Sequence, residues 1–115
     1  MNLESVRVYC LSLPHATEDV QWGNQLVFRV GKKMFAIAPL EGPAKFCLSF
    51  RASAESLAEL LENEAVQPAP YLARYRWVAM ERFDAVSPVE LRELLRISYE
   101  LVLAGLPRNA REGLR

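Results

Sequence analysis

The chain has 115 residues, 51% of them hydrophobic and 24% charged, a composition typical of one globular domain and unlike that of a disordered chain. Its apolar runs fall short of the ~20 residues that span a membrane, and its N-terminus has no signal-type region, so we expect a cytoplasmic protein with no membrane partner. Its 14 Lys and Arg balance its 14 Asp and Glu, and this net charge of zero argues against a strong non-specific binder of nucleic acid.

The first half of the chain predicts one helix followed by antiparallel strands. Asn2 can cap a helix with one apolar face, and Pro14 ends that helix before a polar loop at 15–19. Gly31 and Lys32 fit a two-residue hairpin loop. Alternating apolar residues between turns predict extended segments at 20–22, 25–30, 33–38 and 45–50. Because the turns are short, we expect an antiparallel meander.

The middle of the chain predicts a second helix and one more strand. Ser53 can cap a helix that runs to about residue 63, and its exposed positions are acidic. The stretch 67–70 contains two prolines and is expected to be an extended connector, because proline cannot continue a helix. A further strand is predicted over 75–83.

The strongest helix signal lies near the C-terminus. Ser87 can cap a helix, Pro88 suits its first position, and Glu90 follows in the first turn. A long apolar stripe follows, and Gly105 with Pro107 ends the helix. A shorter terminal helix is expected beyond that point, over 109–114.

The predicted elements follow the order α-β-β-β-β-α-β-α. Helices on one face of a largely antiparallel sheet define an α+β two-layer sandwich. The first helix and the last long helix are the natural pair to cover that face. We find no repeat and no interdomain linker, which predicts a single domain over residues 1–115.

Short motifs spread along nearly the whole chain point to a known family. They are Pro14-His15-Ala16-Thr17-Glu18-Asp19 leading to Trp22-Gly23, Leu48-Ser49-Phe50-Arg51, Pro68-Ala69-Pro70-Tyr71-Leu72, Trp77-Val78, Ser98-Tyr99-Glu100-Leu101-Val102 and Leu106-Pro107. In this order they resemble the MmcQ/YjbR-like family of small bacterial proteins. The resemblance implies a frataxin-like (CyaY-like) sandwich. It also implies the role proposed for that family, DNA binding through a double wing of hairpins.

Basic side chains around the predicted hairpin are candidates for contacts with DNA phosphates. Lys32 and Lys33 at the turn, with Arg29 beside them, would present three cations at the tip of a wing. The candidate nucleic-acid-binding residues are Arg29, Lys32, Lys33, Lys45, Arg51, Arg74 and Arg76. With so few cations, binding to double-stranded DNA would be weak and salt-dependent. The alternative is that these charges only protect exposed strand edges from pairing.

An aromatic set supports a second hypothesis, a module that binds a small ligand or an unknown protein partner. Its residues are Trp22, Tyr71, Trp77, Ser98 and Tyr99, with the cleft expected around the two tryptophans. Such aromatic residues are also common in cores. Ser98 lies on the apolar stripe of the long helix, so its hydroxyl needs a partner, either the carbonyl four residues back or a group on the sheet.

No motif points to catalysis, a metal or another cofactor. His15 is the only histidine, and no nucleophile elbow or triad spacing accompanies it, so we do not expect an enzyme. The glutamates between 55 and 62 are spaced along one helix face. By analogy with the acidic ridge of frataxin they suggest cation binding, but such faces are usually only hydrated, so no metal is expected. Cys10 and Cys47 are expected to be buried free thiols.

Overall fold

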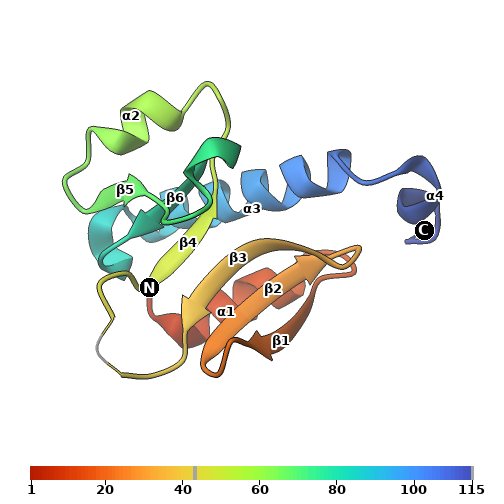
Figure 1. The fold of residues 1–115 in the computed structure, drawn as a ribbon, viewed down its shortest axis with the longest axis horizontal. Coiled ribbons are helices and arrows are strands. Elements are labelled where there is room, and N and C mark those ends of the chain that lie inside the picture. The colour runs from red at the N-terminus through yellow and green to blue at the C-terminus, as the bar shows by residue number, and fades with distance from the viewer. Residues whose placement is uncertain (43, 115) are drawn as a thin grey trace.

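The computed structural model of the protein describes residues 1–42 and 44–114 and shows one sheet backed by helices (Figure 1). The strands are β1 (Thr17–Gln21), β2 (Gln25–Val30), β3 (Lys33–Pro39), β4 (Leu48–Arg51), β5 (Val66–Pro68) and β6 (Trp77–Met80). The α-helices are α1 (Leu3–Ser12), α2 (Leu57–Leu61), α3 (Pro88–Ala104) and α4 (Arg108–Glu112), and the 3-10 helices are η1 (Ala73–Tyr75) and η2 (Phe83–Ala85). Within the described residues, no helix is long and apolar enough to span a membrane.

The six strands form a single sheet in the order β1-β2-β3-β4-β6-β5, and every neighbouring pair is antiparallel. Helices α1 and α3 pack together on one face of this sheet (Figure 1). The main core lies between the two layers, and its largest fully buried side chains include Phe28, Phe35, Phe50, Leu91 and Leu95. The predicted α+β two-layer sandwich with helices on one face is therefore confirmed.

Three local signals in the sequence are confirmed by hydrogen bonds and backbone angles. The side chain of Asn2 accepts a bond from the backbone N of Ser5 (2.8 Å), as a helix cap requires. Ser87 caps α3 in the same way through the backbone N–H three residues later (3.1 Å). Gly31 and Lys32 have φ angles of 56° and 71°, the left-handed values that a two-residue hairpin loop needs.

Both edge strands depart from the prediction. The predicted polar loop at 15–19 is wrong over most of its length, because β1 already begins at Thr17 and pairs with Arg29 of β2. The predicted connector at 67–70 overlaps β5, which pairs with β6. Pro68 is tolerated there because an edge strand leaves one side of its backbone unpaired. Edge strands rich in polar residues or proline lack the apolar alternation on which strand prediction depends.

Two elements of the middle segment are shorter than predicted. The helix expected from Ser53 to about residue 63 is reduced to α2, because Ser53 caps a turn instead, with its Oγ accepting a bond from the backbone N of Ser56 (3.2 Å). The strand expected over 75–83 is reduced to β6, because Arg76 adopts a left-handed φ of 64° at the end of η1. The acidic residues of this region consequently lie mostly in loops.

Ser98 joins α3 to two strands of the sheet. A register irregularity between β2 and β3 leaves Phe35 without a partner in β2, as in a β-bulge. The Ser98 hydroxyl is fully buried, donates to the carbonyl O of Phe35 (2.7 Å) and accepts from the backbone N of Arg51 (3.0 Å). Its partner is therefore the sheet and not the carbonyl four residues back. Because its single proton is already donated, this hydroxyl serves the fold and not a ligand.

The two cysteines are free thiols. Cys10 is fully buried, and this burial raises the pKa of its thiol to about 12. Cys47 is half-buried, and burial is the main cause that raises its pKa to about 11. Because the thiolate is the reactive form, neither cysteine is activated as a nucleophile at neutral pH.

Candidate functional site

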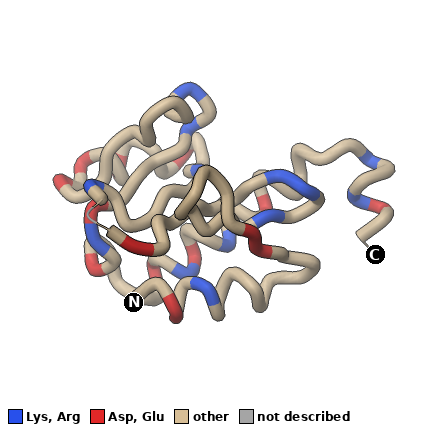
Figure 2. Tube along the Cα trace, turned by 60° about the horizontal axis from the view of Figure 1, so that its bottom comes forward, with Lys and Arg blue, Asp and Glu red and all other residues tan. Residues whose placement is uncertain are grey.

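Most of the predicted DNA-contacting residues lie at one end of the sheet. The register pairs Ile37 with Ser49 and Arg51 with Trp77, so the β2–β3 turn, the last residue of β4 and the first residue of β6 share that end. We call the residues gathered there the basic end: Arg29, Lys32, Lys33, Arg51, Arg74 and Arg76. In the view of Figure 2, basic and acidic residues are interspersed along the described chain trace.

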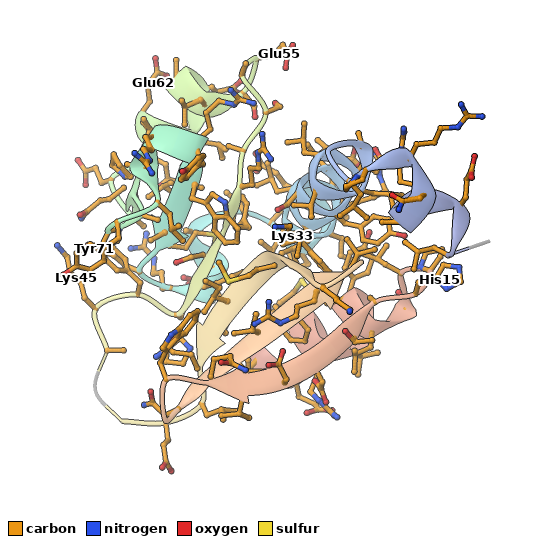
Figure 3. All side chains as sticks on the ribbon, turned by 45° about the vertical axis from the view of Figure 1, so that its right-hand side comes forward. His15, Lys33, Lys45, Glu55, Glu62 and Tyr71 are labelled. Carbon is orange, nitrogen blue, oxygen red and sulfur yellow. The ribbon has the colours of Figure 1, made fainter. Side chains whose placement is uncertain are left out.

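Lys45 does not belong to this group. It precedes β4 at the opposite end of the sheet, far from Lys33 (Figure 3). Its Nζ donates to Oε1 of Gln67 on β5 (3.2 Å) and lies 5.2 Å from the ring centroid of Phe46. The structure thus separates Lys45 from the other candidate cations.

The cations of the basic end differ in how far they are already neutralised. Arg29 Nε donates to Oδ1 of Asp19 (2.8 Å), and Arg29 Nη1 donates to the carbonyl O of Lys32 (3.1 Å). The hydrogen bond from Arg29 holds the pKa of Asp19 below its ordinary value, so this carboxylate stays charged. Lys32 and Lys33 are exposed and form no ion pair with any described residue.

The remaining arginines are held by packing. The guanidinium of Arg74 lies 4.8 Å from the ring centroid of Tyr75. The Nε atoms of Arg51 and Arg76 are buried and find no hydrogen-bond partner within residues 1–42 and 44–114. A backbone bond from Ala52 N to Arg76 O (2.8 Å) ties the ends of β4 and β6 together, so these two arginines come from adjoining positions. Their burial places these Nε atoms inside the packing of the β4 and β6 ends and not on the surface.

The predicted wing tip is packed against the C-terminal segment. A Cβ atom added at Gly31 would overlap the side chain of Leu106, which is only 5% exposed. The hairpin turn is therefore fixed from one side by the residues that link α3 to α4. This contact holds the turn, and with it Lys32, in one place relative to α4.

We expect Gly31→Ala to destabilise the protein by about 1–3 kcal/mol, because it combines a left-handed φ of 56° with the overlap on Leu106. Gly23→Ala is the matched control: Gly23 also has a positive φ, 88°, but its added Cβ would meet nothing within 4 Å. Urea unfolding of both variants measures the difference. Equal losses of stability would show that the contact with Leu106 does not matter.

The predicted aromatic cleft is not assembled. Trp77 is 6% exposed and packs with residues such as Ala79 and Leu72 on the sheet face opposite the helices. Trp22 is 67% exposed in the β1–β2 turn, at the other end of the sheet. Tyr99 is buried, and its hydroxyl donates to the carbonyl O of Pro14 (2.7 Å). Tyr71 is fully exposed on a loop, so the five residues do not share one cavity.

The acidic segment does not form a metal site in the part of the chain that the structure describes, where no group of three or more His, Cys, Asp and Glu side chains comes close enough to hold an ion. Glu55 and Glu62 both lie outside α2 and point away from the body of the protein (Figure 3). Only Glu59 remains in the helix. The helical spacing expected between these glutamates is therefore not realised.

A groove beside the basic end was not predicted from the sequence. It has a volume of about 820 Å³ and lies between the outer strand β1, the hairpin turn and α4. His15, whose φ of 63° is left-handed, lines this groove together with Thr17, Lys32 and Asn109. The terminal helix was expected from the sequence, but no local signal could place it against the hairpin, nearly 80 residues earlier in the chain.

This architecture defines a small α+β protein with a six-stranded antiparallel sheet that carries the basic end. A family model described as YjbR matches residues 11–101, and the chain belongs to the YjbR family. The family resemblance noted in the sequence is thereby confirmed. A search of the curated proteins finds no match.

Two solved structures are similar to this chain. The crystal structure of a Deinococcus radiodurans protein with a DUF419 domain superposes with a TM-score of 0.83 at 30% identity, covering 98% of this chain and 87% of that one. A Pseudomonas syringae protein superposes with a TM-score of 0.70 at 17% identity, covering 89% of this chain and 99% of that one. At 17% identity, the similarity to the Pseudomonas syringae protein supports a shared fold and nothing further.

Proposed function

We propose that the protein binds double-stranded DNA through the basic end, as a binding protein and not as an enzyme. The observation that carries this proposal is the register of β3, β4 and β6, which gathers six of the seven candidate cations at one end of the sheet. Lys32 and Lys33 supply exposed charge that no described acid neutralises. Phosphate oxygens accept readily from such charged donors.

The charge balance limits the strength of this binding. Asp19 already neutralises much of the charge on Arg29, which leaves a small number of cations for phosphates. With about four phosphate contacts, the affinity would fall by about two orders of magnitude between 50 and 200 mM salt. The contacts proposed here go to the backbone of DNA, so they would give little sequence preference.

The test is the double variant Lys32→Glu with Lys33→Glu, measured by fluorescence anisotropy with a labelled duplex at low salt. We expect at least about tenfold weaker binding and a shallower salt dependence, because two cations become anions. Lys45→Glu is the matched control, since Lys45 lies at the other end of the sheet. If the wild-type protein shows no salt-sensitive binding, or if the control loses as much affinity, the proposal fails.

A further inference from the structure

The groove between β1 and α4 has the size and construction of a small-ligand site. Its volume of about 820 Å³ falls in the range of roughly 300–1,000 Å³ that is usual for ligand pockets. Its walls are fixed at two points: Leu106 packs on Gly31 before α4 begins, and Leu114 packs against the main core after α4 ends. The groove is thus built from elements that are far apart in the sequence and anchored on both sides.

The two acidic residues that line the groove each form an ion pair with an arginine. Glu18 accepts three bonds from the guanidinium of Arg7, at 3.0, 2.8 and 2.6 Å, and Asp19 accepts from Arg29 at 2.8 Å. Arg7 also lies 3.6 Å from Glu4, which is not a lining residue of the groove. Among the described residues that line the groove, Lys32 is the one charged side chain that forms no ion pair. The groove therefore favours an anion.

The neutral groups around Lys32 are hydrogen-bond donors. Thr17 offers a hydroxyl, and His15 offers an imidazole. Asn109 uses its Oδ1 to accept from the backbone N of Ala110 (3.0 Å), so its amide Nδ2 remains as a donor. These donors come from a turn, a strand and a helix and reach the groove from different sides.

This arrangement suits a tetrahedral oxyanion better than a planar one. A carboxylate is best recognised by the flat fork of an arginine, and Arg29, the one arginine among the described residues that line the groove, is occupied by Asp19. A phosphate group presents several oxygens in different directions. It can accept from a lysine point charge and from separate neutral donors at the same time.

We propose that this groove binds a small phosphate-bearing ligand, held by Lys32 together with His15, Thr17 and Asn109. This site overlaps the proposed DNA contact at Lys32 and at the already paired Arg29, whereas His15, Thr17 and Asn109 belong to the groove alone. Lys33, the next residue, belongs to the basic end but does not line the groove. The two proposals can therefore fail independently.

The only histidine of the chain is a built-in reporter for this site, because its ring signals in an NMR spectrum need no further assignment. We would titrate inorganic phosphate into the full chain at constant pH and ionic strength, with chloride as the balancing anion, and repeat the titration with acetate. The expected result is a saturable shift of the His15 ring signals with phosphate and a much weaker response to acetate. A response that stays linear, or one that acetate reproduces, would overturn the proposal.

Three exposed positions give matched variants for this titration. Lys32→Ala is expected to weaken the phosphate response by about tenfold or more, whereas Lys33→Ala should leave it unchanged. Asn109→Asp keeps the oxygen that accepts from Ala110 N but replaces the amide donor by a negatively charged oxygen. This variant should therefore abolish the shift of the His15 signals with phosphate. The same variant should leave DNA binding at the wild-type level. Equal effects of Lys32→Ala and Lys33→Ala would indicate diffuse charge attraction and contradict the site.

Discussion

Replacing Ser98 with alanine is expected to destabilise the fold by about 2–4 kcal/mol, although it removes only one oxygen atom. The hydroxyl is fully buried and serves two strands at once, through Phe35 O at 2.7 Å and Arg51 N at 3.0 Å. Without it, one carbonyl and one N–H group lose their partner in the core. Each such unpaired group costs about 1–3 kcal/mol. Urea unfolding with the slope held fixed gives the difference directly.

Ser49→Ala is the matched control for this prediction. Ser49 lies on β4 two residues before Arg51, and its hydroxyl forms no hydrogen bond with a described residue, so its loss should change stability by less than about 1 kcal/mol. Amide exchange offers a second measurement, because the N–H of Arg51 should exchange faster in Ser98→Ala and not in the control. If Ser98→Ala is as stable as the control, the two hydrogen bonds of the Ser98 hydroxyl do not stabilise the sheet.

The features that the sequence predicts well are those decided by neighbouring residues. A cap such as Asn2 or Ser87 bonds to a backbone N–H three residues away, and the hairpin loop at Gly31 and Lys32 depends on the backbone angles of those two residues alone. Such interactions leave a short pattern that can be recognised without knowledge of the fold. The order of most elements and the two-layer arrangement follow from these patterns and from the apolar stripes.

The features that the sequence misses depend on residues far apart in the chain. Ser98 is separated from its partners Arg51 and Phe35 by 47 and 63 positions, so no local pattern could choose between the helix carbonyl and the sheet. Strand β5 exists because β6 lies beside it, and its own three residues contain a proline. Tertiary pairing overrides local propensity in such short segments.

The candidate sites illustrate the same limit. Lys45 and Lys33 are equally basic in the sequence, and only the register of the sheet shows that they lie at opposite ends. Trp22 and Trp77 are separated for the same reason. The groove beside the hairpin forms only because α4 lies close to β1, and no residue pattern in either segment predicts that they lie close together. A site made by topology becomes visible only when the topology is known.

Phe35→Ala is expected to have the largest effect on stability, about 3–5 kcal/mol. Phe35 is fully buried, and its ring packs edge-on against Tyr99 with centroids 5.5 Å apart and lies 6.4 Å from Phe28. Removing the ring opens a cavity between the sheet and α3 that these neighbours cannot fill without moving. Thermal or urea unfolding measures the loss, and Phe35→Leu, which keeps most of the apolar volume, should retain more of the stability than Phe35→Ala.

This substitution also connects the core to the proposed binding surfaces. Phe35 is the bulged residue of β3 and stands two positions after Lys33, at the start of the strand that leads away from the hairpin turn. The bulge is held by the ring on one side and by Ser98 on its carbonyl. In Phe35→Ala variants that still fold, amide exchange should therefore accelerate at the hairpin turn and leave the β5–β6 pair largely unchanged. Uniform acceleration over the whole sheet would contradict this, because it would mean that the ring stabilises the fold globally and does not fix the turn that carries Lys32.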